Sequence, residues 1–214
     1  MPLTRLHLTA LEITHSLTNQ EIQIIINTMG PTIIEKMTNY TFSHRARLIK
    51  PTLSYDGAAV ALSFLPAAGE SLISSANPAP SVSGKGDDEG QAKERTKRDD
   101  NYTYHHLRRD LFNVARSSGV SIDSRYIVPS SHITVGRFLT QSDHDSKEKM
   151  EKWFEKIEEV NEWLRDEFWP QNGEEGKRNL EAEWLVGQQK GLDCREGALW
   201  YGGGVTVRLG RGFE

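Results

Sequence analysis

The chain has 214 residues, with 26 Lys or Arg and 30 Asp or Glu, a formal net charge of −4 and a pI near 6.0. This length is sufficient for one substantial hydrophobic core. The acidic balance argues against a protein that binds long duplex nucleic acid through a broad basic surface. No apolar run approaches the length of a membrane span, and residues 1–5 lead into a predicted strand instead of a signal peptide. We therefore expect a cytoplasmic or nuclear protein with no membrane partner.

Apolar and polar side chains alternate along residues 3–14, which predicts a β-strand. Because successive side chains point to opposite faces of a strand, His7 and Thr9 lie on one face and Leu8 lies on the other. The strand therefore presents an imidazole beside a hydroxyl.

A helix is predicted to begin after Thr18, because Thr18 and Glu21 have the spacing of a capping box. Isoleucine and methionine recur at helical spacing beyond this point. Gly30 and Pro31 interrupt the pattern, since proline removes a backbone donor and clashes with the preceding turn. We expect two helical pieces that meet at this pair.

Residues 45–53 and 57–65 are predicted to be the strands of one hairpin, because Asp56-Gly57 between them is a strong turn signal. From about residue 67 to residue 101 the composition changes to Gly, Ser, Pro, Ala and charged residues. Such a segment buries too little apolar surface to offset the entropy of ordering it. We expect a disordered insertion at about 67–101.

Helical spacing of apolar residues returns at Tyr104 and continues to Ser117, where two serines and a glycine predict the end of a helix. The next predicted strand carries His132 and Thr134 on one face, opposite Ile133. It repeats the arrangement of the N-terminal strand.

A long amphipathic helix is predicted from about Ser146 to Phe168. Its many Glu and Lys residues form the face that contacts solvent. The predicted inner stripe is apolar and consists of Met150, Phe154, Ile157, Val160 and Leu164.

Two or three further strands are predicted within residues 183–187 and 198–207. Three consecutive glycines in the second stretch allow close approach of the backbone. On one interpretation, Trp200 or Tyr201 stacks on a nucleotide base while this loop passes near a phosphate. On the other, the segment is a strand-end bend beside two core aromatic side chains.

The two His-x-Thr strings are the strongest indication of function. Two such strands side by side would line a cleft with two acid–base groups and two hydrogen-bond donors, which suits phosphate ester chemistry. A histidine followed two residues later by Ser or Thr also arises by chance, about once or twice in a chain with this many histidines. We interpret the polar loop string His144-Asp145-Ser146 as such a coincidence.

Residues 6–13, LHLTALEI, and residues 131–138, SHITVGRF, resemble the paired motifs of the 2H phosphoesterase superfamily. This superfamily includes 2′-5′ RNA ligase-like proteins, cyclic nucleotide phosphodiesterases and enzymes that trim RNA 3′ ends. The resemblance implies one domain over residues 1–214, of the α+β (α/β-like) class, with a bilobal fold. In that fold antiparallel sheets line a central cleft and helices pack outside. The strand and helix that precede the first motif in the family are expected to be missing here.

The resemblance also implies a metal-independent phosphodiesterase without a cofactor, acting on 2′,3′-cyclic phosphates of nucleotides or RNA 3′ ends. His7 and His132 would be general base and general acid, in an order that the sequence leaves open. Thr9 and Thr134 would bind the phosphate oxygens. The same groups would support a 2′-5′ ligase-like reverse reaction, and we expect a monomer.

Two alternatives remain open. The first is a catalytically inactive module of the same fold that binds a nucleotide or an RNA end. The second is an unrelated α+β domain in which both His-x-Thr motifs are structural.

The other reactive side chains are expected to have structural roles. Cys194 is the only cysteine, which excludes an intrachain disulfide and a cysteine-based zinc site. No neighbouring base marks it as a catalytic thiol. His105 and His106 lie on the helix predicted from Tyr104, where exposed histidines are common.

Overall fold

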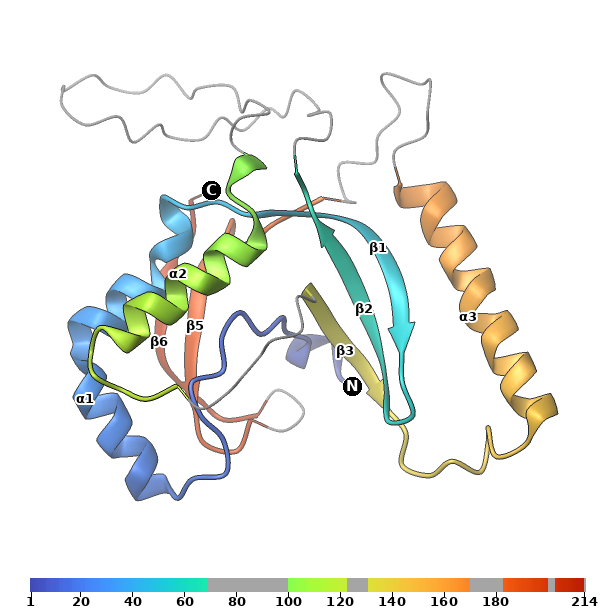
Figure 1. Cartoon of the computed structure of the whole chain (residues 1–214), viewed down its shortest axis with the longest axis horizontal. Coiled ribbons are helices and arrows are strands. Elements are labelled where there is room, and N and C mark those ends of the chain that lie inside the picture. The colour runs from blue at the N-terminus through green and yellow to red at the C-terminus, as the bar shows by residue number, and fades with distance from the viewer. Residues whose placement is uncertain (69–99, 123–130, 170–182, 200–202, 214) are drawn as a thin grey trace. The chain divides into compact units, whose positions relative to one another are not determined.

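A computed structural model describes residues 1–68, 100–122, 131–169, 183–199 and 203–213. Within these ranges a curled antiparallel sheet consists, in spatial order, of β3 (Ser131–Arg137), β2 (Ala59–Pro66), β1 (Arg47–Tyr55) and β4 (Trp184–Leu185) (Figure 1). A separate hairpin consists of β5 (Lys190–Glu196) and β6 (Val205–Arg211), and the helices are α1 (Asn19–Thr38), α2 (Tyr104–Arg116) and α3 (Lys147–Phe168). The predicted α+β class is confirmed.

The chain divides into two compact units. Unit 1 contains Met1–Thr9, Leu48–Leu65 and Ser130–Trp184. Unit 2 contains Ala10–Arg47, Pro66–Pro129 and Leu185–Glu214. Both His-x-Thr strings belong to unit 1, so one unit supplies all four of their polar side chains.

The hairpin of β1 and β2 in unit 1 is closed by the predicted Asp-Gly turn. The Asp56 carboxylate accepts hydrogen bonds from the backbone N–H groups of Ala58 at 2.7 Å and Ala59 at 2.8 Å. This is the local pairing that makes aspartate favourable at the start of a turn. The two predicted strands are confirmed, each displaced slightly along the chain.

This turn should make stability depend on pH. The two backbone hydrogen bonds lower the pKa of Asp56 below its ordinary value. A carboxyl whose pKa is lowered by folding stabilises the fold above its unfolded-state pKa, and that contribution is lost as the pH falls through the folded-state pKa. Asp56→Asn keeps an oxygen acceptor but cannot titrate.

We therefore expect the difference in unfolding free energy between wild type and Asp56→Asn to stay constant from neutral pH down to the ordinary aspartate range. Below that range, the wild type should lose unfolding free energy relative to Asp56→Asn. Urea unfolding of both proteins over a pH series measures this difference. A difference that stays constant into strong acid would show that the turn bonds do not depend on the charge of Asp56.

The strand predicted to carry His132 and Thr134 is confirmed as β3, which pairs antiparallel with β2 in unit 1. The register places Ser63 opposite His132, and Ala61 opposite Thr134. The pairing then shifts, since Val60 lies opposite Gly136. A bulge of this kind adds one residue to a strand and increases its local twist.

The strand predicted over residues 3–14 is wrong for most of its length. Leu3–Arg5 form a 3₁₀ helix, η1, in which the N–H of Arg5 donates to Pro2 O and the N–H of Leu6 donates to Leu3 O. Backbone groups used in this turn are not available to a sheet. Only Leu8 forms an isolated antiparallel bridge, with Ile133.

Farther along the same side of β3, the backbone carbonyl of Val135 has a different hydrogen-bond partner. The N-terminal ammonium of Met1 donates to the carbonyl oxygen of Val135 at 2.9 Å. A charged donor therefore meets an acceptor that a longer N-terminal strand would otherwise have used.

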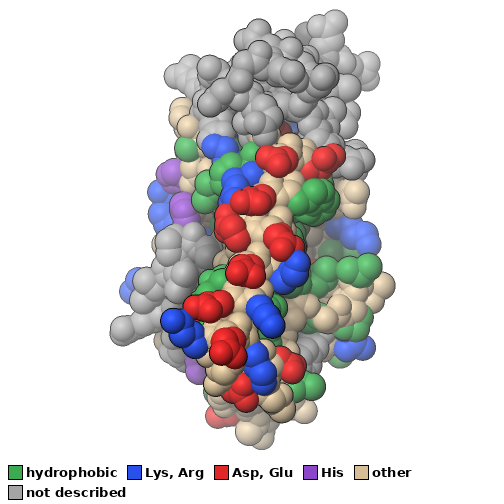
Figure 2. Space-filling view, turned by 90° about the vertical axis from the view of Figure 1, so that its right-hand side faces the viewer, with side chains coloured by type: hydrophobic (Ala, Val, Ile, Leu, Met, Phe, Trp, Pro, Cys, Tyr) green, Lys and Arg blue, Asp and Glu red, His purple; other side chains and the backbone are tan. Residues whose placement is uncertain are grey.

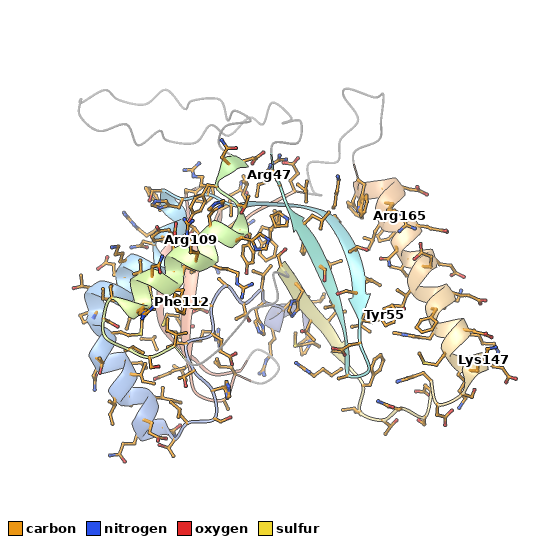
Figure 3. The ribbon with its side chains drawn as sticks, viewed as in Figure 1. Arg47, Tyr55, Arg109, Phe112, Lys147 and Arg165 are labelled. Carbon is orange, nitrogen blue, oxygen red and sulfur yellow. The ribbon has the colours of Figure 1, made fainter. Side chains whose placement is uncertain are left out.

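α3 is confirmed as predicted and covers part of the β1–β2 hairpin within unit 1. Its Trp153 and Phe154 rings lie 6.3 Å and 5.5 Å from the ring of Tyr55, which projects from the end of β1 (Figure 3). The Asn161 side chain accepts from the N–H of Leu53 at 2.7 Å and donates to its carbonyl at 3.2 Å. One amide thus binds both backbone groups of Leu53 and ties α3 to β1.

The predicted inner stripe of α3 is only partly right. Ile157 and Leu164 are buried, but Phe154 is 42 % exposed and Val160 is 38 % exposed. Asn161, which the apolar pattern did not include, is buried instead because its amide binds β1. Figure 2 shows the outer face of α3, where acidic and basic side chains are intermixed, as the sequence predicted for the solvent-facing side.

In unit 2, the predicted capping box and helix break are both confirmed. Thr18 and Glu21 exchange side-chain and backbone hydrogen bonds at the start of α1. Gly30 has a φ of 67°, in the left-handed region, and Pro31 follows it. The two pieces of α1 pack with the end of α2 in a core that contains Met29, Ile34, Ala115 and Val120.

The C-terminal strands differ from the prediction. β4 lies within the predicted stretch 183–187, but β5 occupies residues whose charges and glycine gave no strand pattern. β6 begins only at Val205, because Gly204 has a φ of 81° that an extended strand does not adopt. A Cβ added at Gly210 would clash with the carbonyl of Thr38, so α1 and β6 approach closely only because this residue is glycine.

Residues 69–99 of the predicted insertion lie outside the described residues. Near its predicted end, Asp100 is described and is only 1 % exposed. Its carboxylate pairs with Arg47, a partner far away in the sequence that composition does not reveal.

Candidate active site

The bridge between Leu8 and Ile133 brings the two His-x-Thr strings together in unit 1. In an antiparallel pair, one step to either side of a bridge gives the next opposed residues. His7 therefore lies across from Thr134, and Thr9 lies across from His132. Each imidazole is next to the hydroxyl of the other motif, so the two strings are related by an approximate twofold axis through the bridge.

His132 and Thr134 project from one face of β3, and strand alternation about the bridge predicts the same face for His7 and Thr9. Leu8 and Ile133 point to the opposite face, because side chains alternate along each strand. His7 is exposed, whereas Thr9, His132 and Thr134 are half-buried. The predicted side-by-side arrangement is therefore present at the motifs, although the first motif is held by one bridge and not by a full strand.

The 3₁₀ turn that replaces the predicted strand also orients His7. The Nδ1 atom of His7 lies 3.0 Å from the carbonyl oxygen of Arg5. A carbonyl oxygen only accepts, so this bond requires the proton on Nδ1 and places the lone pair of the neutral ring on Nε2. η1 thus supplies a fixed partner for the imidazole.

β2 extends this face with small side chains. Ser63 and Ala61 lie directly across from His132 and Thr134, and the Ser63 hydroxyl is 2.6 Å from Ser54 Oγ on β1. The sequence carried a signal for this that the motif analysis missed. Small side chains at 59, 61 and 63 alternate with large ones at 60, 62 and 64, which indicates one face kept open and one face packed.

The assembled groups suit acid–base chemistry on a phosphate ester. Imidazole exchanges protons near neutral pH, and hydroxyl groups donate hydrogen bonds to anionic oxygens. Within the described ranges, no group of three or more His, Cys, Asp or Glu side chains is arranged to hold a metal ion.

The aromatic residues predicted to stack on a base, Trp200 and Tyr201, lie outside the described residues. His144 lies in the loop before α3 with its ring 4.6 Å from that of Phe138, and it is not one of the residues at the Leu8–Ile133 bridge.

The histidines of α2 and the cysteine belong to unit 2. His106 accepts or shares a hydrogen bond with Thr103 at the start of α2, at 3.1 Å from its backbone nitrogen. Burial lowers the pKa of His105. Burial also raises the pKa of the Cys194 thiol, which packs against the unit 2 core, so its thiolate is disfavoured.

Comparison of the chain with protein-family models, with curated proteins and with solved structures gave no match. None of the described helices is long and apolar enough to cross a membrane. The geometry around the Leu8–Ile133 bridge is therefore what bears on function.

Proposed function

We propose that the chain is a metal-independent phosphodiesterase of the 2H phosphoesterase type that opens 2′,3′-cyclic phosphates of nucleotides or RNA 3′ ends. The observation that carries this proposal is the Leu8–Ile133 bridge, which aligns two His-x-Thr motifs from distant parts of the sequence on one face of one unit. Chance matches to so short a motif have no reason to pair.

The reaction needs one neutral and one protonated imidazole. The neutral imidazole takes a proton from water as the water oxygen bonds to phosphorus in line with the departing ester. The bond between phosphorus and one ribose oxygen breaks, and that oxygen receives a proton from the other imidazole. Thr9 and Thr134 donate to the non-bridging oxygens, where negative charge increases in the transition state.

The contact between His7 and Arg5 serves either role. With His7 neutral, the proton on Nδ1 leaves a lone pair on Nε2 that acts as the base. With His7 protonated, Nδ1 still donates to Arg5 and Nε2 acts as the acid. A 2′-5′ ligase-like reaction needs the same two groups: the neutral imidazole takes the proton of an RNA 5′-hydroxyl in place of water, that oxygen bonds to phosphorus, and the departing ribose 3′ oxygen receives a proton from the other imidazole.

The proposed substrate is small or is an RNA end. The net charge of −4 disfavours a surface that tracks long nucleic acid, whereas four polar side chains suffice for one phosphate. Trp200 and Tyr201 remain the proposed base-stacking residues. The bilobal fold of the 2H type is also part of the proposal, and the division into two units, one with a four-stranded sheet and one with a hairpin, agrees with it.

The test is turnover of 2′,3′-cyclic nucleotides by the purified protein in excess EDTA, followed by phosphorus NMR in ¹⁸O-labelled water. We expect a nucleoside monophosphate carrying one labelled oxygen. A folded protein that binds nucleoside monophosphates but hydrolyses none of the cyclic substrates would instead be the binding module. EDTA-sensitive turnover, or no phosphate ligand at all, would contradict both.

A further inference from the structure

The side chain opposite His132 on the neighbouring strand is Ser63, and its hydroxyl is held by a second serine. Ser63 Oγ lies 2.6 Å from Ser54 Oγ, and Ser54 Oγ also contacts the carbonyl oxygen of Ala61 at 3.4 Å. Opposed residues of an antiparallel pair have Cβ atoms about 4.5–5.5 Å apart. Ser63 is therefore within reach of a group that His132 binds.

The serine pair places an additional hydroxyl beside His132. His132 has a hydroxyl on each side, Thr9 across the bridge and Ser63 on β2. Farther along β2, the residue opposite Thr134 is Ala61, which offers no polar side-chain atom. Ser63 is half-buried and Ser54 is exposed, so a ligand has access to them. Along β2, the site therefore has a polar extension beside His132 and none beside Thr134.

We infer that Ser63, oriented by Ser54, is a substrate-binding residue that hydrogen-bonds the ribose oxygen released when the cyclic phosphate opens. This inference rests on the proposed function and adds which end of the site holds the ribose. Neither serine belongs to a His-x-Thr motif.

The chemistry of a hydroxyl pair matches the change that this ribose oxygen undergoes. In the cyclic substrate it is an ester oxygen that only accepts, and in the product it is a hydroxyl that donates and accepts. If Ser54 donates to Ser63, the Ser63 proton is available to the ester oxygen. If Ser63 donates to Ser54, and Ser54 donates to Ala61 O, a lone pair of Ser63 is available to the product hydroxyl.

The test measures binding of reaction products, so it does not require turnover. Nucleoside 3′-monophosphate is compared with its 2′-deoxy analogue, and nucleoside 2′-monophosphate with its 3′-deoxy analogue, by calorimetry. We expect Ser63→Ala to weaken binding of one ribonucleotide by about twofold to tenfold, the effect of one neutral hydrogen bond. Binding of the matching deoxy analogue should not change, and Ser63→Thr, which keeps the hydroxyl, should restore binding.

Ser142→Ala is the matched control, because it removes another serine hydroxyl of unit 1, bonded at 3.0 Å to Thr140 in the loop before α3. It should bind every nucleotide as the wild type does. Equal losses for a ribonucleotide and its deoxy analogue in Ser63→Ala, or no loss, would overturn the inference while leaving wild-type turnover intact. A wild type that neither turns over cyclic nucleotides nor binds monophosphates overturns the proposed function itself.

Discussion

Replacement of either motif histidine by alanine is expected to lower kcat for 2′,3′-cyclic nucleotides by about a hundredfold to ten-thousandfold. General acid or general base catalysis by one positioned side chain contributes about that factor. His7 and His132 occupy equivalent places on either side of the Leu8–Ile133 bridge, so both variants should suffer losses of similar size. The double variant should lose little more than either single variant, because the two groups act in one step.

The chain provides a control with the same local sequence pattern. His144 also precedes a serine by two residues, but it lies in a loop against Phe138 and forms no part of the bridge. His144→Ala should keep turnover close to that of wild type. The measurement is kcat at saturating substrate for each variant and for wild type. Unfolding curves show that each variant is folded. Full activity in His7→Ala or His132→Ala, or an equal loss in His144→Ala, would refute the two-histidine mechanism.

The features that the sequence predicted well depend on near neighbours in the chain. The capping box of Thr18 and Glu21 and the turn at Asp56 each close within three residues, so the residue types suffice to recognise them. α3 is similarly determined by its own repeating pattern and by its cap at Ser146. The errors concern partners that lie far away along the chain.

The N-terminal segment and β5 illustrate those errors. Residues 3–5 alternate like a strand, but their backbone forms the local hydrogen bonds of η1, although β3 lies beside this segment at the Leu8–Ile133 bridge. β5 shows no alternation, yet it pairs with β6 because β6 supplies the complementary edge. Alternation is therefore not sufficient for a strand, as residues 3–5 show, and not necessary for one, as β5 shows.

The candidate site shows the same division. The sequence identified the four motif side chains and predicted that the two strings lie side by side, since each carries a recognisable alternation. The sequence did not identify Ser63, because no residue near position 63 indicates that His132 is its cross-strand neighbour. That relation exists only once β2 and β3 pair, so an extension of the site contributed by a neighbouring strand is invisible to motif analysis.

The largest loss of stability is expected from Asp100→Ala in unit 2. The guanidinium of Arg47, at the start of β1, donates through Nε to one carboxylate oxygen of Asp100 at 3.2 Å and through an Nη to the other at 2.6 Å (Figure 3 labels Arg47). The two side chains are 2 % and 0 % exposed, respectively. Removal of one partner from such a pair leaves a buried charge uncompensated, which costs about 3–5 kcal/mol of unfolding free energy.

A double replacement distinguishes the contribution of the ion pair to stability from the contribution of packing. Arg47→Met combined with Asp100→Leu removes both charges and fills the space with apolar atoms, and such exchanges are often neutral or stabilising. We therefore expect the double variant to be more stable than Asp100→Ala alone, although it lacks the ion pair entirely. Urea unfolding of the three proteins measures both differences. If Asp100→Ala were as stable as wild type, the buried carboxylate would not be what compensates Arg47, and the connection between the start of β1 and the residues before α2 would have to rest on packing alone.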